Sequence, residues 1–177
     1  MKTYSHWLGL IACLVVLPIS PAQGRHDPLT QAEIDQLRDT AQEAPERLKL
    51  YVQFARDRLV KLEQARSDPK VKDRGQLTHD GLDDFLSVYN ELDENVDNFA
   101  DRRDDLRKAL KTVIEGDTEF QSKLRAIKNA AGVSAEEASQ YEFVLRDAVT
   151  TVDESVDDHR KLLAEQEDAA RNKKKRH

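Results

Sequence analysis

The chain has 177 residues, of which 35% are charged and 6% aromatic, with only 6 glycines and 5 prolines. β-Sandwiches, barrels and doubly wound α/β enzymes need more turn-forming residues, so the composition argues against them. The apolar residues recur at helical spacing, which argues against disorder and favours an all-α protein. The formal net charge of −6 makes nucleic acid an unexpected partner.

Residues 1–22 have the pattern of a secretory signal peptide. Lys2 is their only charged residue. The apolar run that follows has about eleven residues, too few to span a bilayer, and ends at Pro18. Small residues then allow cleavage after Ala22, with cleavage after Gly24 as the alternative. We therefore expect a periplasmic or secreted protein with no transmembrane segment in its mature chain.

Cys13 is the only cysteine, and it ends a Leu-Ile-Ala-Cys sequence like that of bacterial lipoproteins. Apolar residues continue beyond it, whereas a lipoprotein normally turns polar after its cysteine, so we do not expect Cys13 to carry a lipid. Because Cys13 lies in the predicted signal, the mature chain has no disulfide and no thiol for catalysis or metal binding. Its stability has to come from an apolar core.

The first helix is predicted to begin at Thr30. This residue is a good N-cap and Glu33 completes a capping box, while Leu29 can pack against Ile34 across the cap. Pro45 should kink or break the helix, because proline lacks a backbone N–H and clashes with the preceding turn.

The second helix is predicted to start at Thr78, after a loop at residues 68–75, and to end just before Gly132, a natural C-terminal cap. Its apolar residues fall seven apart in two series, a heptad seam with one charged member, Arg103. Gly116 is an alternative stop, which would divide this helix in two. The apolar members of the seam include Leu82, Phe85, Tyr89, Leu92, Val96, Phe99, Leu106, Leu110 and Val113.

The third helix is predicted to follow Ser134, which can form a second capping box with Glu137. Two apolar stripes run along it, which predicts two neighbouring helices. We therefore expect one domain over residues 29–170, an elongated antiparallel bundle of three long helices, or four if the second breaks at Gly116. His159 takes an apolar position on one stripe, and we expect a partly buried, hydrogen-bonded histidine rather than a catalytic base.

Two charged clusters are candidate interaction sites. Four aspartates recur every four residues in the predicted second helix: Asp93, Asp97, Asp101 and Asp105. This spacing makes them a candidate stripe for weak cation binding. The leading interpretation is a solvated helix surface. Residues 171–177 form a basic tail, which is a candidate contact for anionic lipid, another anionic envelope polymer or the acidic body. The alternative interpretation is a frayed, soluble end of the chain. The cations of the tail are Arg171, Lys173, Lys174, Lys175 and Arg176. Without these five and Lys2, 22 of the 28 basic residues remain against 34 acidic ones.

Motifs for catalysis are not recognisable. The five histidines form no close pair, and there is no Gly-rich phosphate loop and no Gly-x-Ser-x-Gly elbow. We expect no enzyme, no cofactor and no metal site of the zinc type. The leading expectation is an exported, non-enzymatic helical bundle that acts through a protein or cell-envelope partner. The sequence identifies neither that partner nor the oligomeric state.

Residues 29–33, Leu-Thr-Gln-Ala-Glu, resemble the Leu-Thr-x-x-Gln motif of periplasmic helical stress chaperones, and Leu-Thr recurs at 77–78. Glu33 and Gly81 stand where the motif has Gln. The resemblance implies a small, exported, all-helical chaperone. It supplies one alternative function, a chaperone-like binder of apolar clients; a weak cation or polyanion binder is the other.

Overall fold

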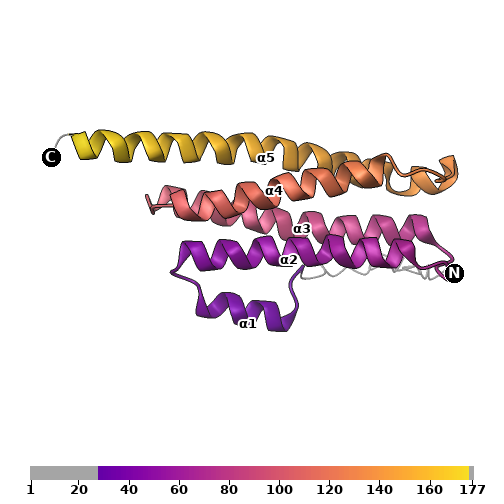
Figure 1. The fold of residues 1–177 in the computed structure, drawn as a ribbon. Helices are drawn as coiled ribbons and strands as arrows, with labels where there is room; N and C mark the ends of the chain where they lie inside the picture. Colours follow the sequence, from indigo (N-terminus) through magenta and orange to yellow (C-terminus); the bar gives the residue numbers. More distant parts are fainter. Residues whose placement is uncertain (1–27, 176–177) are drawn as a thin grey trace, which may run out of the picture.

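The computed structural model describes residues 28–175, which form five α-helices and no strand (Figure 1). The helices are α1 (Gln31–Asp39), α2 (Ala44–Ser67), α3 (Arg74–Asp101), α4 (Arg107–Lys128) and α5 (Ala135–Lys175). The predicted signal peptide, with Cys13 and both cleavage sites, lies outside the described residues, as do Arg176 and His177. The all-α prediction is confirmed, whereas the prediction of three long helices is wrong.

Helices α2 to α5 form a four-helix bundle, and the short α1 packs on the outside of α2 (Figure 1). Each helix runs antiparallel to the one before it. The order around the bundle is α2, α3, α5, α4, so α3 and α4, although consecutive in the chain, lie diagonally opposite. Helices α3 and α5 therefore lie side by side and run in the same direction. None of the described helices is apolar over a stretch long enough to cross a membrane.

The core follows the predicted heptad seam along the bundle axis. At its centre the rings of Phe85, Tyr89 and Phe120 contact one another, with centroids 5.4 to 6.0 Å apart. Phe120 meets the other two rings edge to face, and Phe85 stacks on Tyr89; both arrangements add to the stabilisation that burial alone provides. The nine seam residues named above are all buried: Leu82, Phe85, Tyr89, Leu92, Val96, Phe99, Leu106, Leu110 and Val113.

The predicted second helix is two helices, α3 and α4, and the break lies at residues 102–106 instead of Gly116. Arg103 takes a left-handed conformation with φ of 63°. The N–H groups of Arg103 and Asp104 bond back to carbonyls in the last turn of α3, which is the Schellman geometry of a helix end. Leu106 is buried in the core directly after the turn. The apolar spacing of seven residues therefore continues in the sequence although the chain reverses its direction there.

Gly116 lies inside α4, where it allows α4 to approach α2 closely. A Cβ at Gly116 would lie 2.7 Å from Cγ1 of Val52. Gly81 has the same role between α3 and α2, because a Cβ there would lie 2.8 Å from Cδ1 of Leu62. These two glycines mark contacts between helices, which explains why neither of them ends one.

Three of the other predicted helix ends are confirmed, whereas α4 ends at Lys128 with Asn129 as its C-cap, before the predicted cap at Gly132. The N–H of Glu33 donates to Oγ1 of Thr30 at 3.3 Å, and the N–H of Thr30 donates to Oε2 of Glu33 at 2.7 Å, which completes the capping box of α1. Pro45 lies in the first turn of α2, directly after the break that it predicts. Ser134 accepts a hydrogen bond from the N–H of Glu137 at 3.1 Å at the start of α5.

The predicted start at Thr78 is wrong by one helical turn. Helix α3 begins at Arg74, and the carboxylate of Asp73 caps it by accepting from the N–H of Gln76 at 3.1 Å. Thr78 is buried inside the helix, and its hydroxyl donates to the carbonyl of Arg74 at 2.7 Å. Gly75, expected in the loop, lies in the first turn.

Candidate functional site

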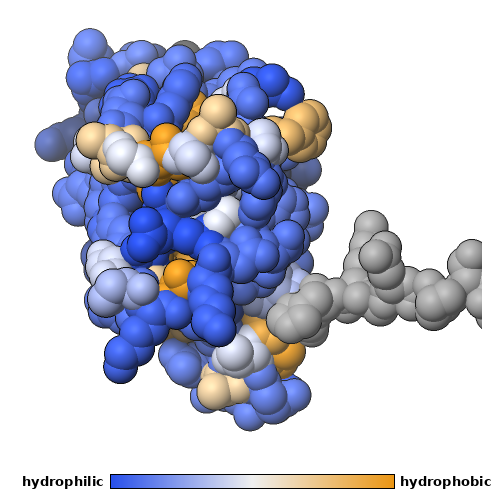
Figure 2. Space-filling view, turned by 90° about the vertical axis from the view of Figure 1, so that its right-hand side faces the viewer, coloured by the Kyte–Doolittle hydropathy of each residue, from blue (hydrophilic) through white to orange (hydrophobic). Residues whose placement is uncertain are grey.

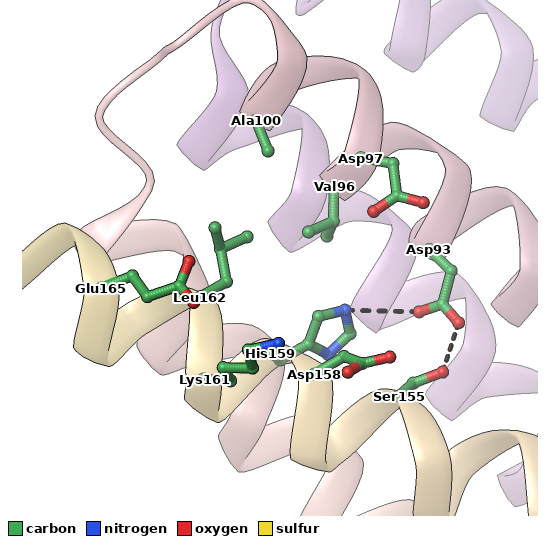
Figure 3. Close-up of a pocket in the computed structure, with 10 residues that line it drawn as sticks. All are labelled: Asp93, Val96, Asp97, Ala100, Ser155, Asp158, His159, Lys161, Leu162 and Glu165. Carbon is green, nitrogen blue, oxygen red and sulfur yellow. Dashed lines mark hydrogen bonds and ion pairs between the residues drawn. The ribbon is translucent and has the colours of Figure 1, made fainter.

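Five polar side chains from α3, α4 and α5 meet inside the bundle, and we call them the polar cluster: Tyr89, Asp93, Asp117, Ser155 and His159. Asp117 is fully buried and accepts a hydrogen bond from the hydroxyl of Tyr89 at 2.9 Å. Its other oxygen lies 2.9 Å from Nδ1 of His159. Nε2 of His159 lies 3.4 Å from Oδ1 of Asp93, whose second oxygen accepts from Ser155 (Figure 3).

The charge state of His159 follows from these contacts. Burial acts to lower its pKa, but the hydrogen bonds and negative charges of Asp117 and Asp93 outweigh burial and raise the pKa to about 9. The imidazole is therefore protonated at neutral pH, with a carboxylate at each ring nitrogen. A general base must be able to accept a proton, so His159 is unsuited to that role. Burial and the same two carboxylates raise the pKa of Tyr89, which stays a neutral donor.

The expectation for His159 is confirmed, since the residue is buried and hydrogen-bonded. Sequence reasoning missed Asp117, the most deeply buried charge of the cluster. A signal was present, because Asp117 lies four residues after Val113 and three before Phe120, on the core side of α4. A carboxylate at such a position needs a buried partner, and His159 is the partner on α5.

The polar cluster reaches the surface at a cleft of about 280 Å³ between α3 and α5, which we call the acidic cleft. Asp93 and His159 lie in it next to the apolar side chains of Val96, Ala100 and Leu162 (Figure 3). Three further carboxylates and one amine line it: Asp97, Asp158, Glu165 and Lys161. Within residues 28–175, no three or more His, Cys, Asp or Glu side chains are grouped so that they could hold a metal ion.

The four aspartates of the predicted stripe do not share one helix. Asp93, Asp97 and Asp101 lie on α3, but the helix ends at Asp101, and Asp105 lies in the connection to α4. Asp93 belongs to the polar cluster and Asp97 to the acidic cleft, while Asp101 is exposed. Asp105 is held by Arg107, whose hydrogen bonds of 2.8 and 2.5 Å lower the pKa of that carboxyl to about 2. The stripe is therefore interrupted.

Helix α5 continues past the rest of the bundle and carries Arg171, Lys173, Lys174 and Lys175 of the predicted basic tail on its projecting end (Figure 1). Gln166 ties α5 to the α3–α4 connection, accepting from the N–H of Leu106 at 2.8 Å and donating to the carbonyl of Asp104 at 3.2 Å. Glu167 pairs with Lys111 at 3.4 Å. Beyond Glu167, the described part of α5 makes no hydrogen bond or ion pair with another helix.

The charged side chains of the segments 102–106 and 167–175, at this end of the bundle, fall into two sets. The carboxylates have basic partners: Asp104 pairs with Arg102, Asp105 with Arg107, Glu167 with Lys111 and Asp168 with Arg171. Four exposed cations have no carboxylate of the described chain within ion-pairing distance, and we call them the free cations: Arg103, Lys173, Lys174 and Lys175. The α3–α4 connection and the projecting end of α5 together form the basic end.

A groove of about 380 Å³ lies between α2 and α3, which we call the α2–α3 groove. Its apolar lining comes from the facing sides of the two helices: Leu62, Ala65, Leu77 and Gly81. Charged residues also line it, with cations on α2 and carboxylates on or next to α3: Arg58, Lys61, Asp73, Asp80 and Asp84.

Comparison with known proteins assigns no function to this fold. The sequence matches no family model, and searches of the curated proteins and of the solved structures find no match. The polar cluster, the basic end and the α2–α3 groove are the features of the described residues that bear on function.

Proposed function

We propose that the protein is an exported, non-enzymatic helical bundle that binds a protein or a component of the cell envelope through its basic end. The observation that carries this proposal is that the polar and charged side chains of α5 are paired in its middle and unpaired near its end. Its buried polar residues, Ser155 and His159, bind partners on α3 and α4, whereas beyond Glu167 it carries cations without partners in the described chain. Unpaired exposed cations are free to meet an outside partner without breaking contacts within the protein.

Two further observations support the proposal. The signal-peptide pattern of residues 1–22 supports export. The protonated state of His159 supports a role without catalysis, because both ring nitrogens already face carboxylates.

Site-specific photocrosslinking in the exporting host tests the proposal. A photoreactive residue replaces Lys174 on the projecting end of α5, or Lys70 in the turn between α2 and α3 at the other end of the bundle (Figure 1). We expect adducts at position 174 and few at position 70. Equal adducts at both positions, or none at either, would contradict the proposal.

The α2–α3 groove supports a second candidate function, a chaperone-like binder of apolar clients. This function ranks second because Phe143 is the only large hydrophobic side chain that is exposed within residues 28–175. At the end of the bundle opposite the basic end, apolar residues form separate spots on a mostly hydrophilic surface (Figure 2). A chaperone should suppress aggregation of a heat-unfolded client, and Leu77→Asp in the groove should abolish that effect. No suppression by the wild type would remove this candidate.

A further inference from the structure

The basic end concentrates positive charge that the protein does not neutralise. In the segments 102–106 and 167–175, every carboxylate is engaged by an arginine or lysine, and every charged side chain left unpaired is a cation. Asp101 and Glu165, which directly precede these segments, have no ion pair and are exposed. The unpaired charge of the two segments themselves is entirely positive.

Arg103 adds its charge here in a strained backbone conformation. Its φ of 63° lies in the left-handed region, which glycine adopts freely and which is unfavourable for residues with a Cβ. The Schellman turn at the end of α3 holds Arg103 in this conformation, and residues held in this way are concentrated at functional positions. The exposed side chain of Arg103 lines the same hollow as Lys173 of α5.

Two adjacent hollows at the basic end share Arg107 and Ala170 in their walls. The larger, of about 470 Å³, is lined by Arg103 and Lys173, and the smaller, of about 290 Å³, by Arg171 and Lys174. Asp104, Asp105 and Glu167 also line them, but each is held by its own cation. Arginine and lysine donors around an open hollow suit the oxygens of a phosphate group.

The helical form of the projecting end holds its cations away from the acidic body. From Glu167 to Lys175 the helix rises about 12 Å, at about 1.5 Å per residue. Charges in physiological salt are screened over about 8 Å, so repulsion between the body and an anionic surface is weak when only the tip touches it. Residues 171–175 are Arg-Asn-Lys-Lys-Lys, without an apolar face, which favours contact with headgroups over insertion among acyl chains.

We propose that the basic end docks on an anionic phospholipid surface and that the bundle stands away from that surface. The inference rests on the proposed function, whose partner it names. A protein interface usually has an apolar, well-packed centre, and the projecting end offers no large apolar side chain for one. A layer of phosphates requires only a cluster of accessible cations, which the basic end supplies.

Vesicle co-sedimentation of the processed protein tests this docking. The vesicles contain phosphatidylcholine alone or with about 30 mol% phosphatidylglycerol, since each cation near an anionic surface strengthens binding about fivefold. We expect binding only to the anionic vesicles. The triple variant K173Q/K174Q/K175Q should bind about 100-fold more weakly, which is the product of three such factors. Glutamine keeps the helix propensity of lysine, so the helix itself should persist.

The matched control is K70Q/K72Q/K128Q, which makes the same change in net charge with exposed lysines at the opposite end of the bundle. It should bind like the wild type. No binding of the wild type to anionic vesicles, or equal loss in both triple variants, would overturn the proposal. Binding to soluble polyphosphate but not to vesicles would also overturn it, yet would leave the proposed function standing, because the crosslinking experiment tests that function separately.

Discussion

The polar cluster and the basic end contain the same kinds of charged groups in opposite situations. In the cluster, the imidazolium of His159 lies between two carboxylates, and Asp117 binds both His159 and Tyr89. At the basic end, the free cations face solvent without a carboxylate partner in the described chain. A buried charge is tolerated only when it is paired, whereas an exposed charge needs no partner and costs little. The paired charges of the cluster therefore serve the fold, whereas the unpaired cations of the basic end are available for binding.

The largest effect should come from Asp117→Ala. The variant leaves the protonated His159 and the hydroxyl of Tyr89 without their buried acceptor, and breaking a buried pair in this way costs about 3–5 kcal/mol. Denaturant unfolding measures the loss of free energy. Asp157→Ala, at an exposed position of α5, is the control and should change the stability by less than about 0.5 kcal/mol. A loss below about 1 kcal/mol for Asp117→Ala would mean that the cluster is not a structural pair.

The second effect is a dependence of stability on pH. The pKa of His159 is raised to about 9 in the folded protein, against the ordinary value of 6.5. The stabilisation is complete below pH 6.5, declines as the unfolded chain loses its proton first, and is lost as the pH rises through 9. At about 1.4 kcal/mol per pKa unit, the total is roughly 3 kcal/mol. Unfolding measured from pH 6 to pH 10 should show this decline, and His159→Gln should show a flatter profile.

A smaller effect, an increase in stability instead of a loss, is expected from replacing Arg103. Glycine adopts the left-handed conformation without steric cost, so Arg103→Gly should stabilise the protein by about 0.5–1 kcal/mol while weakening vesicle binding about fivefold. Arg102→Gly is the neighbouring control. It should destabilise the protein, because Arg102 adopts a right-handed conformation, stacks on Phe99 and pairs with Asp104. Loss of stability in Arg103→Gly would show that its side chain has a structural role.

The smallest effect on stability should come from K173Q/K174Q/K175Q. These side chains make no hydrogen bond or ion pair in the described protein, and surface changes away from special features usually fall within about 0.5 kcal/mol. Favourable interaction of lysine with the C-terminal end of the helix dipole sets a similar limit. Thermal unfolding by circular dichroism measures the effect. A loss comparable to that of Asp117→Ala would remove the distinction between the two regions.

Much of the fold follows from the sequence, because burial follows periodicity. The seam residues, the cap at Thr30 and the break at Pro45 all express local rules of spacing and backbone chemistry. The reversal at Arg103 does not follow, because a left-handed arginine is rare and the heptad spacing from Phe99 to Leu106 runs straight across it. The diagonal order of α3 and α4 is likewise a property of three-dimensional packing that periodicity does not encode.

The candidate site is predictable in part. The sequence places His159 on a buried stripe and the cations at the end of the chain. It does not show that Asp117 is the buried partner of His159, because the two lie on different helices. Nor does it show that α5 remains helical through Lys175 and projects beyond the bundle, since that depends on where the other helices end.

A fluorescence measurement can show directly whether the basic end docks on an anionic membrane end-on. Because Cys13 is the only cysteine and lies in the predicted signal peptide, a single cysteine can be introduced and labelled in the processed protein. An environment-sensitive dye is attached to Asn172→Cys on α5, or to Lys70→Cys in the α2–α3 turn, and spin-labelled lipid in anionic vesicles serves as quencher. Docking by the basic end should give strong quenching at position 172 and little at position 70. Equal quenching at both positions, or none at 172, would contradict it.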